Sequence, residues 1–208
     1  MNNSKIKICG ISNKKILEEL INLGLDYVGF IFYKKSPRFA SNEFLESIKD
    51  INFRDTIPVC VYVNPEENYV YKTSSYFKNP ILQFHGDEKL EFCESFDLEY
   101  WKAIRVKDKE DVSKAQSFSS ASAILFENYK EGHFGGTGES FNWNFLKYIQ
   151  NKEQNFILSG GINYENVDNA LSTNSWCIDL NSGVESEEGK KDIKLIKNIL
   201  NKINKHEI

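Results

Sequence analysis

The sequence predicts an α/β protein in which eight parallel strands close into a barrel with helices on the outside. Eight short runs rich in β-branched and aromatic residues recur along the 208 residues, and the segments between them carry apolar residues at helical spacing. Strands that alternate with helices pair in parallel through right-handed crossovers. Eight such units leave no gap for a second domain, so we expect residues 1–208 to form one (β/α)8, or TIM, barrel. An open, doubly wound sheet is the alternative, but it rarely needs eight units.

The expected strands are the short runs themselves, which begin near Lys5, Tyr27, Pro58, Ile81, Tyr100, Ala123, Phe156 and Cys177. The first two helices follow from an apolar face and a cap. Residues 16–21 form one face that ends at Gly24, a favourable C-cap residue, and residues 44–51 form another that Ser41 precedes as N-cap. The pair Asn64–Pro65 predicts the start of the third helix, as N-cap and first-turn proline.

The remaining helices are predicted from apolar spacing alone. Their apolar positions are, in chain order, Leu90, Cys93 and Phe96; a weak group from Val112 to Phe118; Leu146 and Ile149; Val167, Ala170 and Leu171; and Ile193, Ile196, Leu200 and Ile203. The last group is the most regular, because its members recur at every third or fourth residue.

The composition excludes several classes of protein. The net charge is −4, so there is no overall positive field to hold nucleic acid or an anionic membrane surface. No apolar run approaches the ~18 residues of a membrane helix, and Lys7 breaks the first apolar stretch, so we expect no secretory signal. Four widely spaced cysteines without a CxxC pair suit a reducing, cytoplasmic location.

Glycine placement distinguishes one end of the barrel. Glycine is required where φ is positive or where the backbone approaches a ligand closely. Gly24 and Gly29 lie elsewhere, but ten of the 12 glycines fall at or after the carboxyl end of an expected strand: Gly10, Gly86, Gly132, Gly135, Gly136, Gly138, Gly160, Gly161, Gly183 and Gly189. Turn glycines with only a structural role would occur at both ends, so the bias indicates a functional face at the carboxyl ends.

Alternation along the strands predicts which side chains point into the barrel. In four strands the inward positions are Lys7 and Cys9, Gln83 and His85, Leu125 and Glu127, and Cys177, Asp179 and Asn181. We therefore expect Cys9, His85, Glu127 and Asp179 to converge in the carboxyl half of the barrel. A thiol opposite a carboxyl group is a suitable base and acid pair for moving protons on a carbon acid.

The cysteines also have a structural interpretation. A buried cysteine is usually a small core hydrophobe, and we assign that role to Cys60 and Cys93. Cys9 differs, because it ends a strand, precedes glycine and shares its face with Lys7, whose charge favours the thiolate.

Asp179, Glu127 and His85 can likewise have a structural or a functional role. Asp179 is expected to pair with Lys7 inside the barrel. An inward glutamate such as Glu127 is costly unless it is paired or functional. His85 fits a satisfied interior histidine and a site residue equally well.

Loops after the last two strands predict an anion site. Ser159–Gly161 ends the seventh strand and Asn181–Gly183 ends the eighth, and barrel loops at these positions commonly bind phosphate through backbone N–H groups. No Walker or Rossmann glycine pattern occurs, which argues against a nucleotide. Arg38, in the loop after the second strand, is suited to bidentate capture of a carboxylate, although by itself it would be a solvated surface arginine.

Seven motifs, spread in order over nearly the whole chain, resemble those of the phosphoribosylanthranilate isomerases, enzymes of tryptophan biosynthesis. They are KICGI at 7–11, GFIFYKKSPR at 29–38, VCVYVN at 59–64, LQFHGDE at 82–88, GGTGESFNW at 135–143, LSGGINYENV at 158–167 and DLNSGVESEEGKKD at 179–192. No single motif would suffice; their common order and spacing carry the resemblance.

The resemblance implies a reaction and a set of roles. The reaction is the Amadori rearrangement of N-(5-phosphoribosyl)anthranilate to 1-(2-carboxyphenylamino)-1-deoxyribulose 5-phosphate. Cys9 is then the general base and Arg38 holds the anthranilate carboxylate. The remaining substrate-binding residues implied are His85, Gly160, Gly161, Asn181, Ser182 and Gly183, of which the glycines and Ser182 belong to the phosphate loops.

The chain departs from the family pattern at two positions. The family's general acid is an aspartate that ends the sixth strand, where this chain has Glu127 and a spacer to Gly135 that is one residue longer. Glutamate keeps the carboxyl group, but a displacement of ~1 Å can cost ~100-fold in rate. Asn128 cannot serve as an acid, and Glu131 is a weaker candidate. The second departure is Asn181, where serine is more usual.

The implied chemistry needs no cofactor and no metal, because the substrate's own nitrogen is the electron sink. The expected partner is a small phosphosugar-anthranilate molecule, with no nucleic acid and no membrane, and residues 128–140 are the expected lid. Two alternatives remain. One is a related barrel that uses two carboxylates on another aminoaldose phosphate, against which Cys9 argues. The other is a phosphate-binding barrel that has lost its acid, against which the retained Cys9, Arg38 and loop glycines argue.

Overall fold

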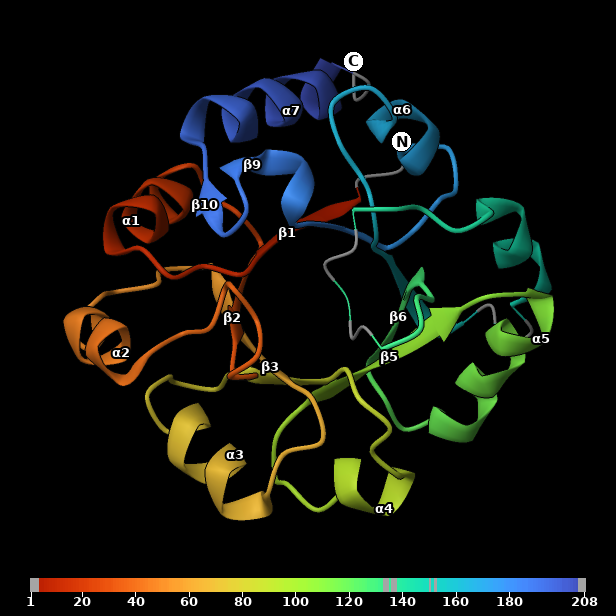
Figure 1. Ribbon diagram of the computed structural model, residues 1–208, viewed down its shortest axis with the longest axis horizontal. Coiled ribbons are helices and arrows are strands. Elements are labelled where there is room, and N and C mark those ends of the chain that lie inside the picture. Colours follow the sequence, from red (N-terminus) through yellow and green to blue (C-terminus); the bar gives the residue numbers. More distant parts are fainter. Residues whose placement is uncertain (1–3, 133–134, 136–137, 150, 152, 206–208) are drawn as a thin grey trace.

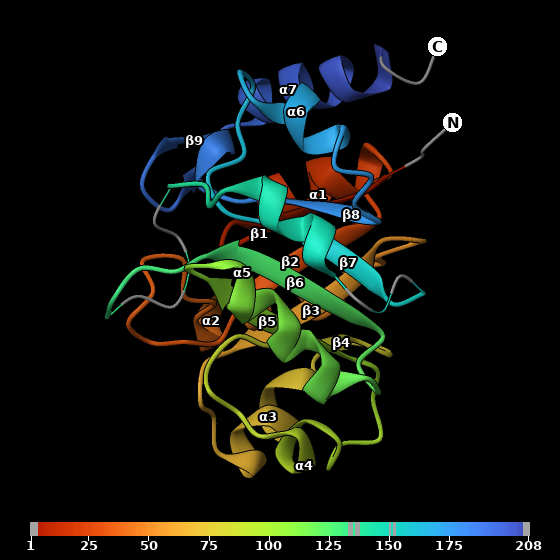
Figure 2. The same ribbon diagram turned by 90° about the vertical axis from the view of Figure 1, so that its right-hand side faces the viewer.

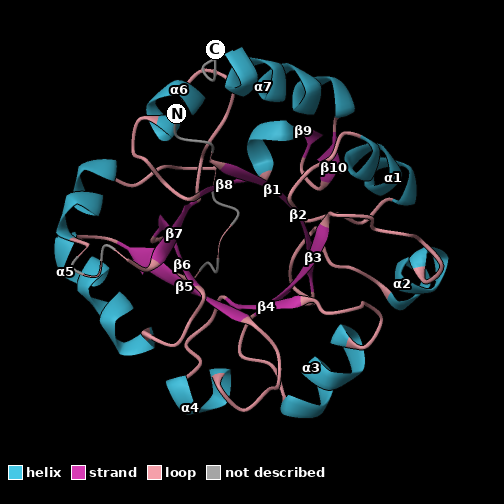
Figure 3. Ribbon diagram, turned by 180° about the vertical axis from the view of Figure 1, so that it is seen from behind, coloured by secondary structure: helices cyan, strands magenta, loops and turns pink. Residues whose placement is uncertain are grey.

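Eight parallel strands form a closed barrel in sequence order, with the last paired to the first (Figures 1 and 3). The computed structural model describes residues 4–132, 135, 138–149, 151 and 153–205. The strands are β1 (Lys5–Cys9), β2 (Tyr27–Ile31), β3 (Ile57–Tyr62), β4 (Ile81–Phe84), β5 (Tyr100–Val106), β6 (Ala123–Asn128), β7 (Asn155–Leu158) and β8 (Cys177–Leu180). The predicted barrel is confirmed, and closure of β8 onto β1 excludes the open sheet.

The helices surround the barrel. They are α1 (Lys14–Asn22), α2 (Asn42–Ile48), α3 (Glu67–Ser74), α4 (Leu90–Cys93), α5 (Lys109–Val112), α6 (Val167–Leu171) and α7 (Ile193–Lys205), with 3₁₀ helices η1 (Ser113–Phe118), η2 (Trp143–Tyr148) and η3 (Ser182–Val184). A short antiparallel pair, β9 (Glu185–Glu187) and β10 (Lys190–Lys191), follows η3. From the side, α6 and α7 lie together, across the strands from α3 and α4 (Figure 2). None of the described helices is long and apolar enough to cross a membrane.

The predicted ends of the first two helices are confirmed, whereas that of the third is wrong. Ser41 Oγ accepts a hydrogen bond from the backbone N–H of Phe44, and Gly24 follows α1 with φ of +71°. Asn64, however, is not an N-cap: α3 begins three residues later, at Glu67. Asn64 has a φ of +44° and its Oδ1 accepts from the N–H of Asp87 at 2.8 Å. A contact with the next loop therefore replaced the local cap.

Three helices differ from those expected from apolar spacing. The weak group from Val112 to Phe118 begins at the last residue of α5 and continues as the 3₁₀ helix η1. α4 ends at Cys93 and does not extend to Phe96. The segment containing Leu146 forms the 3₁₀ helix η2, and Ile149 lies just beyond its end. The two apolar residues are three positions apart, the interval at which side chains eclipse in a 3₁₀ helix. An interval of three alone therefore did not distinguish the two helix types.

The barrel interior is filled from its amino end, which leaves room for a site at the other end. Tyr27, Trp101 and Trp176 pack together near the starts of β2, β5 and β8, with ring centroids 5.0 to 6.0 Å apart. Above them, Lys7 Nζ lies 3.0 Å from Asp179 Oδ2 as a buried ion pair, as predicted. Residues further along the strands line the carboxyl end.

Candidate active site

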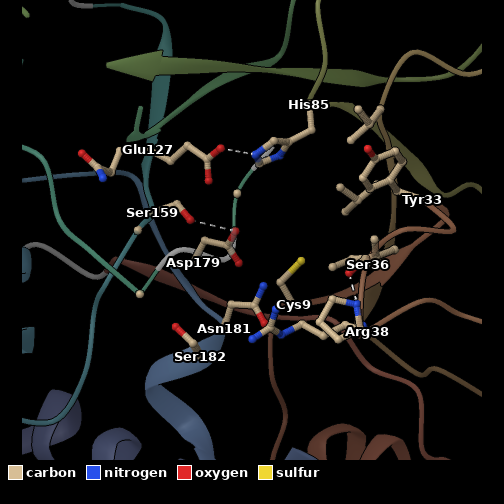
Figure 4. Close-up of a pocket in the computed structure, with 18 of the residues that line it drawn as sticks. Cys9, Tyr33, Ser36, Arg38, His85, Glu127, Ser159, Asp179, Asn181 and Ser182 are labelled. Carbon is tan, nitrogen blue, oxygen red and sulfur yellow. Dashed lines mark hydrogen bonds and ion pairs between the residues drawn. The ribbon is translucent and has the colours of Figure 1, made fainter. Parts of the chain in front are cut away.

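A cavity of about 250 Å³ opens among the carboxyl ends of the strands. Cys9 from β1, His85 after β4, Glu127 from β6 and Asp179 from β8 line it and point toward one another (Figure 4). The convergence expected from alternation is therefore observed. Arg38 also lines this cavity, as do residues of the loops after β7 and β8, among them Gly160, Gly161, Asn181 and Ser182.

Cys9 is the last residue of β1, and its side chain lies above the Lys7–Asp179 pair. Burial raises the pKa of the Cys9 thiol; the ammonium groups of Lys7 and Lys191 act in the opposite direction, and Asp179 raises it further. Lys7 thus acts as expected, but burial outweighs it. Burial also opposes the charge on Lys7 itself, yet Asp179 holds the pKa of Lys7 above its usual range.

The pKa of Cys9 can be tested directly by alkylation. Because burial raises this pKa, the rate of carbamidomethylation of Cys9 by iodoacetamide will rise with pH and reach its midpoint above about 8.5, the ordinary value for a cysteine. Peptide mapping by mass spectrometry separates Cys9 from the other three cysteines. A midpoint at or below pH 8 would contradict the prediction. Protection by a bound product analogue is the control for reaction inside the cavity.

Gly29 gives the thiol its space, and the sequence did not indicate this. It pairs with Cys9 in the β1–β2 register, and a Cβ on Gly29 would lie 2.7 Å from Cys9 Sγ. Its φ lies outside the left-handed region, so close approach and not backbone conformation requires glycine here. A glycine in the middle of an expected strand was the available signal.

Glu127 is held by His85, which is in turn held by Gln83. His85 Nε2 lies 2.5 Å from Glu127 Oε1, and Gln83 Nε2 lies 2.8 Å from His85 Nδ1. All three side chains are buried. The inward glutamate is therefore paired, as its cost required, and its partner is the histidine that alternation placed on the same face.

Arg38 is buried and is not a solvated surface arginine. Its Nε and Nη2 each donate to Glu185 over 2.7 Å, one to each carboxylate oxygen. Glu185 also forms an ion pair with Lys191, whose Nζ lies 2.7 Å from Asn181 Oδ1. Burial opposes the charge on Glu185, but the hydrogen bonds from Arg38 and Lys191 lower its pKa. Glu185 therefore fixes the orientation of the guanidinium, and Nη1 is not one of the two nitrogens that bind Glu185.

Backbone conformation at the β7 and β8 loops requires glycine. Gly160 and Gly161 have φ of +90° and +65°. Gly183 is not among the residues that line the cavity, and a Cβ there would lie 2.0 Å from the carbonyl oxygen of Ile162. With Ser182, which begins η3, these residues bring two backbone turns close together. The arrangement suits an anion that accepts hydrogen bonds from backbone N–H groups.

The loop expected to act as a lid is described only in part. Gly132, Gly135 and Gly138 line the cavity. Residues 133–134 and 136–137, with Gly136 and part of the GGTGESFNW motif, lie outside the described residues. Glu131, the weaker candidate for the acid, is exposed, whereas Glu127 is buried at the cavity wall.

Comparison with known proteins gives consistent results. Residues 6–202 match the family model described as N-(5'phosphoribosyl)anthranilate (PRA) isomerase. An N-(5'-phosphoribosyl)anthranilate isomerase of Thermoanaerobacter sp. (strain X514) is 36% identical over 201 residues, which cover 96% of this chain and 97% of that protein. A protein of the same name from Aquifex aeolicus is 36% identical over 199 residues, 94% of this chain and 96% of the relative.

Solved structures agree over the same length. The phosphoribosyl anthranilate isomerase of Thermotoga maritima has a TM-score of 0.85 at 30% identity, covering 97% of this chain and 99% of that chain. A second such structure, also 30% identical with the same coverage and a TM-score of 0.78, holds reduced 1-(o-carboxyphenylamino)-1-deoxyribulose 5-phosphate.

Proposed function

The chain belongs to the N-(5'-phosphoribosyl)anthranilate isomerase family, and we propose that Cys9 and Glu127 are the general base and the general acid of its reaction. The enzyme is an isomerase of tryptophan biosynthesis that converts N-(5'-phosphoribosyl)anthranilate to 1-(o-carboxyphenylamino)-1-deoxyribulose 5-phosphate. The observation that carries the assignment is that Cys9 and Glu127 line one cavity from different strands (Figure 4). Between them they supply a proton acceptor and a proton donor to one small molecule.

Glu127 opens the sugar ring. In its neutral form it gives a proton to the ring oxygen, the bond from that oxygen to C1′ breaks, and the nitrogen lone pair forms an iminium. The iminium draws electrons from C2′, which makes the C2′–H acidic. Cys9 as thiolate removes this proton and leaves an enolamine. Protonation of C1′ and loss of the O2′ proton give the ketone and return Cys9 to the thiolate and Glu127 to the acid, so that no net proton or electron is gained or lost.

We assign binding of the substrate's carboxylate and phosphate groups to residues at the rim of the same cavity. Arg38, oriented by Glu185, offers Nη1 to the anthranilate carboxylate, and His85 lies beside the acid. The phosphate is assigned to backbone N–H groups of the β7 and β8 loops, at Gly160, Gly161, Asn181, Ser182 and Gly183. The ligand class, a small phosphosugar, is that of the compound bound in the related structure.

The proposal also covers the domain organisation and the cellular location of the protein. We assign residues 1–208 to a single barrel domain, because the strands of the barrel run from Lys5 to Leu180 and α7 packs beside α6. A cytoplasmic location is supported by four cysteines that are all free and buried, the state favoured in a reducing compartment.

Replacement of Arg38 by alanine will raise KM about 10- to 100-fold, because a hydrogen bond to a charged group contributes about 1.5–3 kcal/mol. The turnover number will change less, since Arg38 does not contact the reacting carbons. Arg54, which is exposed, supplies the matched control: Arg54→Ala leaves KM unchanged. Steady-state kinetics of both variants test whether Arg38 binds the anthranilate carboxylate. An unchanged KM for Arg38→Ala would mean that another group binds it.

The assignment is tested by following anthranilate fluorescence while the purified protein consumes N-(5'-phosphoribosyl)anthranilate. We expect turnover without added metal or cofactor. Absence of turnover, with retained binding of the reduced product, would instead support a phosphate-binding barrel that has lost its acid.

A further inference from the structure

One buried polar group next to the acid takes no part in the reaction as derived so far. Gln83 lies on β4 and its side chain is fully buried. Its Nε2 lies 2.8 Å from His85 Nδ1, but its Oε1 is buried and has no hydrogen-bond partner among the described residues. An unsatisfied buried acceptor costs stability, so the position of this amide calls for an explanation.

The orientation of the amide fixes the proton on His85. A carboxamide nitrogen is a donor only, so Nδ1 of His85 must accept from it. A neutral imidazole that accepts at Nδ1 carries its proton on Nε2. That proton points at Glu127 Oε1, 2.5 Å away.

The reverse orientation of the amide is less favourable. It would place Gln83 Oε1 against Nδ1 and move the amide nitrogen, with two donors, to the position where the oxygen has no partner. Buried N–H groups without acceptors are rarer in proteins than under-satisfied carbonyl oxygens. This general preference agrees with the orientation in the structure, in which Gln83 Nε2 faces His85 Nδ1 and donates to it.

We propose that Gln83 is a positioning residue for the isomerisation: it holds His85 in the Nε2–H tautomer, so that Oε1 of Glu127 always accepts and the acidic proton resides on Oε2. This inference rests on the proposed role of Glu127 as the acid. In Figure 4 the second carboxyl oxygen of Glu127 points into the cavity, away from His85. The proton is thus confined to the oxygen that faces the substrate.

Gly135 lies close to the contact between His85 and Glu127. A Cβ on Gly135 would lie 3.0 Å from Glu127 Oε2 and 3.2 Å from His85 Nε2. The backbone of Gly135 therefore lies close to the contact between His85 and Glu127, and the absence of a side chain there leaves Oε2 uncrowded. With the opposite tautomer, the lone pair of Nε2 would face Oε1 and attract the proton of the acid to the oxygen turned away from the substrate.

The tautomer can be observed in the unmodified enzyme. The chain has three histidines, His85, His133 and His206, so long-range ¹H–¹⁵N correlation spectra of protein labelled at histidine will be simple. A His85→Gln variant assigns the signal. We expect a neutral ring with its proton on Nε2. A neutral ring protonated on Nδ1, or a ring protonated on both nitrogens, would overturn the proposal without bearing on whether the enzyme turns over.

Two substitutions test the consequence for catalysis. Gln83→Met keeps the volume and removes the donor. We expect the single tautomer to be lost and kcat to fall about 10- to 100-fold with little change in KM, by analogy with the loss of a group that orients a metal-bound histidine. Gln83→Glu places an acceptor at Nδ1 and will move the proton there, with a larger fall in kcat. An unchanged kcat, or a loss with the wild-type tautomer retained, would reduce Gln83 to a packing role.

Gln154→Met is the matched control. This half-buried glutamine donates to the carbonyl oxygens of Phe118 and Ala121 and does not line the cavity. It will leave the His85 spectrum and kcat unchanged. Wild-type enzyme without turnover would contradict the proposed function, whereas the spectrum would still report on Gln83, so the two failures are distinguishable.

Discussion

Replacement of Cys9 by alanine will lower kcat by about 10³-fold or more, within the range of a lost general base, while the enzyme still binds the reduced product analogue. Cys9 lines the cavity, and its sulfur as thiolate is the proton acceptor of the proposed reaction, whereas Asp179 Oδ2 forms an ion pair with Lys7. Alanine removes the sulfur and leaves Arg38 and the β7 and β8 loops in place. Turnover measured by fluorescence and affinity measured by calorimetry will separate the two effects.

Cys60→Ala is the control for Cys9→Ala. Cys60 is fully buried on β3, in the layer between the strands and the helices, and it has the role of a small core hydrophobe. Its loss will lower thermal stability and leave kcat within about twofold, because no catalytic contact is removed. Equal losses of affinity and turnover in Cys9→Ala would instead make the thiol a structural residue.

Strand positions and inward faces could be predicted because barrel strands obey a period of two that local sequence displays. Helix starts could not always be predicted. Asn64–Pro65 is a favourable helix-opening pair, yet Asn64 binds the N–H of Asp87 and its own N–H donates to Glu88 Oε1. These partners lie on the next loop and are more than 20 residues away. Long-range hydrogen bonds therefore prevent the helix from beginning at the pair that local propensity favours.

The site was predicted where it depends on alternation along the strands, and the buried ion pairs of Glu185 were missed. Cys9, His85 and Glu127 each occupy an inward position near a strand end. Glu185 and Lys191, in contrast, lie on the charged hairpin of β9 and β10 and were not predicted as site residues. Glu185 is paired both with Lys191 and with Arg38, which lies about 150 residues earlier in the chain. Charge complementarity across such a separation becomes visible only in three dimensions.

Glu127→Gln will be nearly inactive, whereas Glu127→Asp will retain measurable activity. The amide still accepts from His85 Nε2 through its oxygen, so the hydrogen bond at Oε1 is preserved and the cavity keeps its shape. The substitution removes the acidic proton on Oε2, and an amide cannot supply a proton to the ring oxygen in its place. We expect kcat to fall about 10³-fold, in the range of a lost general acid.

The aspartate variant separates the need for an acid from the need for its position. It keeps a carboxylic acid and withdraws it by one methylene, so the 2.5 Å contact with His85 is lengthened or lost. A displacement of ~1 Å costs up to ~100-fold, so Glu127→Asp will lie between the wild type and Glu127→Gln. Single-turnover kinetics on all three proteins give the order. If Glu127→Gln were as active as Glu127→Asp, the proton would have to come from another group, and the cavity would need a different acid.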